Sequence, residues 1–325
     1  MAHADSAGRW EDAARGRDAR SPAEIPKRGW RDVALRVKER MSRDRLSIIA
    51  AGVAFYALMA VFPALAALVA IYGLAFDPQQ VSAQVAWLGS ALPKEAADIL
   101  VGQLKDLVQT DSTALGIGAV VGVLLAVWST SSGVRTVMDA LNVAYDEEER
   151  RGTIKFYAIA LFLTLAALAG MAILIALIVA IPVGAKFLGL GPAAELAASI
   201  VRWPIVALWV MFGLAVLYRF GPSRRQPRWA WVSHGAVIAT VLWLVGSVLF
   251  SIYVTYFASY NKTYGSAGAV VILLTWFLLS SYVVLIGAEI NAESERQTRR
   301  DTTIGGQRPL GERGAHAADT VGRTP

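Results

Sequence analysis

Apolar residues in this chain are gathered into six long runs that are separated by polar stretches. The runs cover 48–76, 115–138, 155–181, 200–219, 233–257 and 268–290. At a rise of about 1.5 Å per residue, each run forms a helix that can cross a hydrocarbon layer about 30 Å thick. The fourth run is the weakest, because Arg202 and Pro204 lie in its first turn. The pattern predicts an all-α fold, a polytopic transmembrane helical bundle with six spans.

The composition agrees with a bilayer protein. Hydrophobic residues make up 55% of the 325 residues and charged residues only 17%, and the mean hydropathy is +0.48. Soluble domains carry about 25% charged residues. The chain has no cysteine and three histidines, so disulfides and thiolate chemistry are excluded and a multi-histidine metal centre is not expected. We therefore expect no cofactor and no metal.

Lysine and arginine alternate between rich and poor segments along the chain. Twelve lie in residues 1–47, two between 77 and 114, four in 219–232 and six after residue 291. Because cationic residues accumulate on the cytoplasmic side of membrane proteins, this alternation places both termini in the cytoplasm. The first 45 residues contain no apolar signal-peptide core, so we expect the first span to act as an uncleaved anchor.

The polar segments outside the spans divide the chain further. Residues 1–29 and 293–325 are polar and contain proline or glycine, which predicts disordered cytoplasmic tails. The transmembrane domain itself covers 48–292. Within it, 77–114 is an acidic extracytoplasmic loop with apolar residues at helical spacing, which predicts short amphipathic helices on the outer surface.

Residues 30–47 have the pattern of an amphipathic helix. Trp30, Val33 and Val37 repeat at helical spacing, while cations such as Arg36 and Arg40 occupy the other faces. This pattern favours a helix at the membrane interface, with its cations near anionic headgroups. The alternative is a solvated helix that leads into the first span.

Four segments together resemble the YihY/BrkB family of bacterial inner-membrane proteins. They are AAGVAFYALMAVFPALAAL (50–68), WSTSSGVRTVMDALNVAYDEEERRG (128–152), LYRFGPSRRQPRWAWVSHGAVIATVLWLVGSVLFSIYV (217–254) and YNKTYGSAGAVVILLTWFLLSSYVVLIGAEIN (260–291). The resemblance covers roughly residues 30–292 and implies a multi-pass protein of the bacterial inner membrane. Members of the family are linked to serum resistance and virulence. They were long labelled ribonuclease BN, a name considered a misassignment.

The chemistry of the chain does not favour a ribonuclease. A nuclease needs clustered metal-binding carboxylates or histidines, and the acidic run at 146–149 is typical of a solvated loop. The basic loop with Arg219, Arg224, Arg225 and Arg228 could contact RNA, but membrane orientation and lipid headgroups explain it sufficiently. No GxxxxGK[ST] motif is present. We expect neither nucleic acid binding nor an enzyme.

Ionisable residues inside spans are costly and are therefore candidates for function. Arg135 lies near the end of the second span and Glu289 at the end of the sixth, and in a six-span topology both arrive at a similar depth. We predict that these two residues pair, joined by Asp139 and Asn142 one and two turns after Arg135. The alternative is that each charge reaches water or headgroups separately.

Further polar and small residues lie within the spans. The hydroxyls of Ser129, Ser131 and Ser132 either bond back to the preceding helical turn or line a central cavity. Pro63 is expected to kink the first span, and Gly118 with Gly122 forms a GxxxG motif for helix packing.

The sequence favours a transporter or lipid-handling protein for an anionic or amphipathic substrate. Its predicted partners are membrane lipids, with anionic headgroups at the cytoplasmic face. The alternative is a scaffold for envelope integrity or virulence that transports nothing. A continuous polar cavity would favour the transporter or lipid-handling protein, and a solid apolar bundle would favour the scaffold. The sequence leaves the substrate, the energy source and the oligomeric state open.

Overall fold

The computed structural model describes residues 12–75, 115–187, 191–257 and 266–325, and this part of the chain is almost entirely helical. Its elements are η1 (Pro22–Glu24), α2 (Lys27–Arg43), α3 (Leu46–Ala75), α6 (Leu115–Ala144), α7 (Thr153–Phe187), α8 (Gly191–Phe220), α9 (Trp229–Phe257), α11 (Ser266–Glu295) and α12 (His316–Asp319). The described residues contain no strand, only an isolated bridge between Pro227 and Thr303. The predicted all-α class is confirmed.

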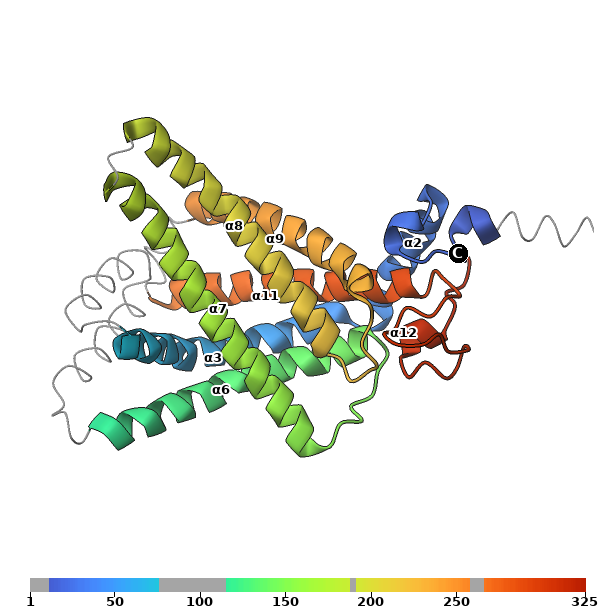
Figure 1. The fold of residues 1–325 in the computed structure, drawn as a ribbon, viewed down its shortest axis with the longest axis horizontal. Helices are drawn as coiled ribbons and strands as arrows, with labels where there is room; N and C mark the ends of the chain where they lie inside the picture. The colour runs from blue at the N-terminus through green and yellow to red at the C-terminus, as the bar shows by residue number, and fades with distance from the viewer. Residues whose placement is uncertain (1–11, 76–114, 188–190, 258–265) are drawn as a thin grey trace, which may run out of the picture.

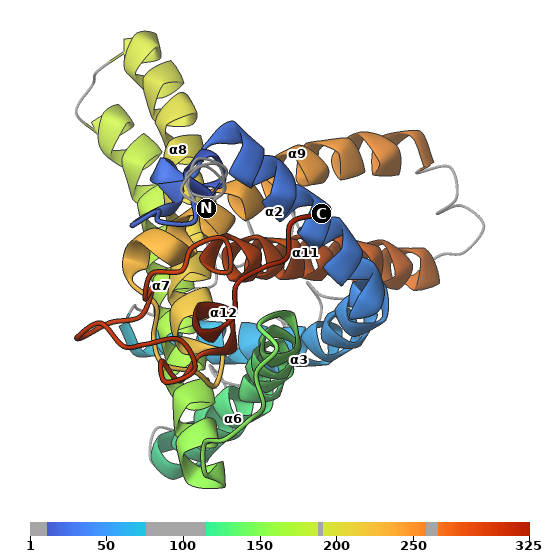
Figure 2. The ribbon, with the colours of Figure 1, turned by 90° about the vertical axis from the view of Figure 1, so that its right-hand side faces the viewer.

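The six long helices pack in a closed order. Each of α3, α6, α7, α8 and α9 contacts the next, and α11 contacts both α9 and α3 (Figure 1). The short helices α2 and α12 lie with the C-terminus at one end of this bundle, on the right in Figure 1 and toward the viewer in Figure 2. We call this end the tail end, because residues 12–25 and 296–325 lie there.

Four stretches of the described chain are long and apolar enough to cross a membrane. They are Thr153–Ile178, Ile200–Phe220, Trp229–Thr255 and Val270–Glu295. A fifth is added if α2 and the first half of α3, which meet at a bend of 67°, form one broken span. Large apolar side chains are exposed along these helices, for example Phe212 and Val248, as expected for surfaces that face lipid. The chain is therefore a membrane protein with four or five such spans among its described residues.

Helices α9 and α11 approach each other closely at Gly235. A Cβ atom at the buried Gly235 would overlap the carbonyl oxygen of Gly287, and it would lie 2.5 Å from Asn291 Oδ1. Asn291 Oδ1 also accepts a hydrogen bond from the Gly235 backbone N–H, at 2.8 Å. Glycine at residue 235 thus lets two backbones approach and share a polar contact inside the bundle.

We expect Gly235→Ala to destabilise the bundle by about 1–3 kcal/mol, because the new methyl group meets a rigid backbone. Gly213→Ala on α8 is the matched control, since a Cβ there has no atom within 4 Å. Helix propensity alone would make the control neutral or stabilising by up to about 1 kcal/mol. Thermal unfolding in detergent compares the two, and equal melting temperatures would contradict the assigned contact.

The N-terminal segment differs from the predicted disordered tail over residues 12–29. Ala19 and Ile25 are buried and pack against Trp231 at the start of α9. The Arg17 guanidinium is also buried and donates to the Gln297 carbonyl oxygen. Polar composition misleads here, because these side chains satisfy backbone groups of a distant segment instead of water. The part of the predicted tail before residue 12 lies outside the described residues.

The C-terminal segment, predicted as disordered over 293–325, is also packed at the tail end. Thr298, Thr302 and Thr303 are buried, and Arg313 donates to the carbonyl oxygens of Arg299, Arg300 and Ala318. The order comes from arginine and threonine side chains that bond to backbone carbonyl and carboxylate groups, and not from an apolar core. Such long-range polar pairing leaves no periodic pattern in the sequence.

Helix α2 covers most of the predicted amphipathic segment 30–47, but its cations do not all face outward. The Arg36 and Arg40 side chains are buried against α11, where Arg36 Nε lies 2.5 Å from Glu293 Oε2. The prediction that these two arginines meet headgroups is wrong, because acidic residues on α11 pair with them.

Other predictions fall at the margin of the described chain. The predicted loop 77–114 lies outside the described residues. Gly118 and Gly122 lie in the first turns of α6, and Pro63 lies inside α3, which continues to Ala75. The predicted kink and GxxxG contact stay predictions.

Candidate anion-binding pocket

The structure does not bring Arg135 and Glu289 together. Arg135 Nη1 donates to Ser131 Oγ at 2.5 Å, and its guanidinium lies over the Tyr157 ring, 4.7 Å from the centroid. The ion pair that the structure assigns to the fully buried Glu289 is with Arg40 Nε, at 3.8 Å. The predicted pair is wrong, because α2 folds back on α11 and supplies a different arginine.

The other predicted site residues have mostly local partners. Ser131 and Ser132 donate to the carbonyl oxygens of Trp128 and Ser129, three residues earlier. The hydroxyls therefore bond back to the preceding turn, which was one of the two expected arrangements. Asp139 lies one turn after Arg135 on α6, but no ion pair within 4.0 Å joins the two among the described residues, so their association stays a prediction.

Asn142 has a structural role that the sequence did not indicate. Its Oδ1 accepts the Ser223 N–H at 2.7 Å, and its Nδ2 donates to Glu149 Oε2 at 3.0 Å. It thus joins the loop after α6 to the loop after α8. These two loops form opposite walls of a pocket.

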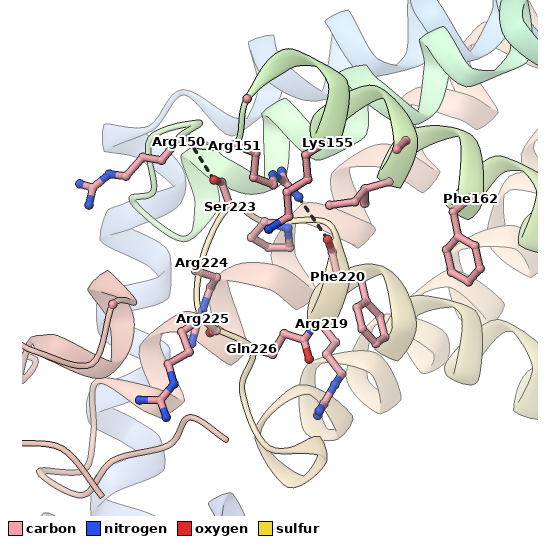
Figure 3. A pocket seen from close by; sticks show the side chains of 15 residues that line it. Arg150, Arg151, Lys155, Phe162, Arg219, Phe220, Ser223, Arg224, Arg225 and Gln226 are labelled. Carbon is pink, nitrogen blue, oxygen red and sulfur yellow. Dashed lines mark hydrogen bonds between the residues drawn. The ribbon is translucent and has the colours of Figure 1, made fainter. Parts of the chain in front are cut away.

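The pocket has a volume of about 730 Å³ and lies at the tail end, between the start of α7 and the end of α8. Figure 3 shows the side chains that line it. They are Arg150, Arg151, Gly152, Lys155, Ala158, Ile159, Phe162, Arg219, Phe220, Pro222, Ser223, Arg224, Arg225, Gln226 and Gly314. Six of these residues are cationic and none is acidic. The volume is within the usual range for a small-molecule site.

Local sequence explains how the loop after α8 turns into the pocket wall. Helix α8 ends at Phe220, and Gly221 donates its N–H to the Leu217 carbonyl oxygen at 2.8 Å. A Cβ at Gly221 would lie 2.6 Å from that same oxygen, so a larger residue does not fit. Pro222 follows and cannot continue the helix. The chain then presents Ser223, Arg224 and Arg225 in sequence.

Half of the pocket cations have a carboxylate partner. Arg151 Nη2 lies 2.6 Å from Glu149 Oε2, and Arg224 Nη2 lies 2.6 Å from Glu295 Oε2. Arg150 lies 3.9 Å from Glu148, and both side chains are exposed. Burial disfavours the charged form of Glu149, but hydrogen bonds from Arg151 and Asn142 outweigh it and lower its pKa to about 2. Glu149 therefore neutralises Arg151 throughout the physiological range.

The remaining cations, Lys155, Arg219 and Arg225, have no carboxylate within 4.0 Å among the described residues. Arg219 Nη1 donates to the Pro227 carbonyl oxygen at 2.6 Å, and its guanidinium stacks on the Trp229 ring. In Figure 3 Lys155 lies beside Arg151 on one wall, while Arg225 points away from the middle. The pocket and its rim thus keep uncompensated positive charge, which favours an anion.

One wall of the pocket continues into the apolar surface of α7. Ala158 and Phe162 line the pocket, and Phe162 is 64% exposed. Leu165 and Ile173 follow on the same face and are exposed as well. A ligand with a charged head and an apolar body can therefore contact both the cationic walls and this face.

The sequence indicates only one wall of the pocket. It predicts a headgroup contact for the basic loop at 219–228, whereas the wall with Arg151 and Lys155 is not predicted. The sequence feature that could have indicated this second wall is the cationic stretch ERRGTIK (149–155), which ends where the third apolar run begins. The described residues contain no group of three or more histidine, aspartate or glutamate side chains that could hold a metal ion.

A known protein family matches this chain over most of its length, and individual relatives match parts of it. The family described as virulence factor BrkB matches residues 37–310. A putative ribonuclease-like protein YfkH of Bacillus subtilis is 36% identical over 180 residues, which is 53% of this chain and 63% of that protein. The UPF0761 membrane protein IL2447 of Idiomarina loihiensis is 39% identical over 99 residues, 30% of this chain and 34% of its own.

These matches span less than two thirds of either relative. No solved structure matches. The family match covers most of the chain and includes both walls of the pocket. The two relatives are named as a ribonuclease-like protein and as a membrane protein. Because the family matches residues 37–310, the chain belongs to the virulence factor BrkB family.

Proposed function

We propose that this protein binds an anionic amphiphile from the membrane, such as a lipid, and handles or transports it. The observation that carries the proposal is the pocket of about 730 Å³ with six cationic and no acidic lining residues, one wall of which continues into the exposed apolar face of α7. Cationic pockets beside spans bind anionic headgroups, and an apolar wall accommodates acyl chains. The role proposed is binding and movement, not catalysis.

The proposal includes a topology. We propose six spans in a bacterial inner membrane, with both termini in the cytoplasm. Support comes from the alternation of cationic segments and from the packing of residues 12–25 and 296–325 at one end of the bundle. In this topology the pocket opens at the cytoplasmic headgroup layer. That leaflet is rich in anionic lipids, which matches the charge of the pocket.

Native mass spectrometry of protein released from mixed vesicles tests the binding role. The vesicles contain phosphatidylcholine with either phosphatidylglycerol or phosphatidic acid. The wild type should retain anionic lipid, and Lys155→Gln with Arg225→Gln should retain at least about tenfold less, because the loss of even one charge-assisted hydrogen bond costs about 1.5–3 kcal/mol. Lys27→Gln with Arg28→Gln removes the same charge from exposed residues of α2.

The control variant should retain lipid like the wild type. Equal lipid retention by the pocket variant and the control would contradict the binding role of this pocket. A wild type that carries no anionic lipid at all would favour the scaffold function instead.

A further inference from the structure

We infer that the pocket selects a headgroup with at least two negative charges, a phosphomonoester or a diphosphate, over the singly charged phosphodiesters of common lipids. The inference rests on the proposed function and adds the chemical class of the ligand. It is carried by the number of uncompensated cations, by single guanidinium nitrogen atoms that have no acceptor in the pocket wall, and by the start of α7.

Charge balance is the first argument. Lys155, Arg219 and Arg225 have no carboxylate partner among the described residues. A singly charged phosphodiester would leave two of these three cations uncompensated in one pocket. A doubly or triply charged headgroup neutralises most or all of them, and nearby cations favour its fully ionised form.

Hydrogen-bond capacity is the second argument. The Arg219 residue is 9% exposed and the Arg224 side chain is fully buried, yet Arg219 Nε and Arg224 Nη1 have no acceptor among the described residues. Arg225 Nη1 is likewise buried without an acceptor. Buried donors are normally satisfied, so this wall lacks acceptor oxygens. A phosphomonoester offers three terminal oxygens, one more than a phosphodiester, and arginine binds such groups in a bidentate manner.

The start of α7 contributes a third element. The first hydrogen bond of this 35-residue helix runs from the Phe156 N–H to the Gly152 carbonyl oxygen. The N–H groups of the residues before Phe156 therefore have no partner within the helix, and its first turn contains no acidic side chain. Gly152 borders the pocket, so the positive end of the helix dipole adds to its cations.

Gly152 also offers a clean test, because a Cβ there has open space around it. Gly152→Asp and Gly152→Ser both supply a side-chain oxygen that caps α7, so both should fold. Only the aspartate adds a negative charge to the pocket. A comparison of the two variants therefore separates the effect of an added negative charge in the pocket from any effect of the substitution on the stability of α7.

The experiment measures lipid retention by native mass spectrometry from vesicles of phosphatidylcholine that contain equal amounts of phosphatidic acid and phosphatidylglycerol. The wild type should retain phosphatidic acid, a phosphomonoester, about tenfold over phosphatidylglycerol, a phosphodiester. The control variant Lys27→Gln with Arg28→Gln, which changes exposed residues of α2 outside the pocket, should do the same. The serine variant should fold and keep more of this preference than the aspartate variant. The aspartate variant should lose most of this preference. Inorganic diphosphate, added as a competitor, should displace the lipid only partly, because it lacks the apolar body.

Three results would overturn the inference. Equal retention of both lipids would remove the charge selectivity while leaving the proposed lipid binding intact. Absence of both lipids from every sample would remove the proposed function as well. Complete displacement of phosphatidic acid by stoichiometric diphosphate would identify a free phosphate compound, and not a lipid, as the ligand.

Discussion

Replacing Glu295 with glutamine is expected to lower the free energy of unfolding by about 3–5 kcal/mol, the usual effect of removing one partner from a buried ion pair. The carboxylate and Arg224 are both fully buried, with Oε2 and Nη2 2.6 Å apart. The same oxygen accepts a hydrogen bond from the Thr302 hydroxyl at 2.6 Å. The Arg224 guanidinium also lies over the Tyr145 ring, 5.0 Å from its centroid, so the ring covers one face of it.

The pair joins three parts of the tail end, because Arg224 belongs to the pocket loop, Glu295 ends α11 and Thr302 lies in the C-terminal segment. Burial disfavours charge on Arg224, but Glu295 outweighs it and raises the pKa of the guanidinium. Arg224 therefore stays charged, and a neutral residue at 295 leaves that charge unpaired. The variant should also loosen the pocket wall and reduce lipid retention.

Chemical unfolding in mild detergent measures the effect. Glu148→Gln is the matched control, since Glu148 is 86% exposed and lies 3.9 Å from Arg150. An exposed pair contributes about 1 kcal/mol or less, so the control should unfold like the wild type. If both variants lose equal stability, the Arg224–Glu295 pair does not hold the tail end together.

The sequence predicts the helices well, because the thickness of the bilayer determines the length of the apolar runs. The run 155–181 corresponds to α7, Thr153–Phe187, and the run 268–290 to α11, Ser266–Glu295. At the tail end α6 extends beyond its apolar run to Ala144, α11 extends to Glu295, and α9 already begins at Trp229. These polar extensions were missed, since their charges are satisfied by residues far away in the chain.

The tail end and the pocket were predicted only in part for the same reason. Arg36 and Glu293 are separated by 257 residues, and no local pattern links them. The predicted pair of Arg135 and Glu289 used equal depth in the membrane as its only criterion, and depth does not determine which helix faces are opposed. The basic loop after α8 was visible in the sequence, whereas its facing wall on α7 required the fold.

Arg40 is the centre of a second buried ion cluster, and its removal should be as costly as that of Glu295. Its guanidinium bonds to Asp146 after α6, and its Nε lies 3.8 Å from Glu289 and 3.5 Å from Glu293 on α11. Both glutamates are fully buried. We expect Arg40→Met to cost about 3–5 kcal/mol, because Glu289 then has no cation within ion-pair distance among the described residues.

A double-mutant cycle with Glu289→Gln tests whether the cost arises from this uncompensated carboxylate. Glutamine is uncharged, so Arg40→Met should cost less in its presence, with a coupling energy of about 1–3 kcal/mol. Lys38→Met, an exposed position on the same helix, controls for the loss of a cation from α2. Strictly additive losses would mean that Glu289 is stabilised by other groups and that Arg40 acts through Asp146 and Glu293 instead. A positive coupling would instead establish that Arg40 of α2 neutralises α11 from inside the bundle, so that this buried arginine cannot serve as a headgroup contact.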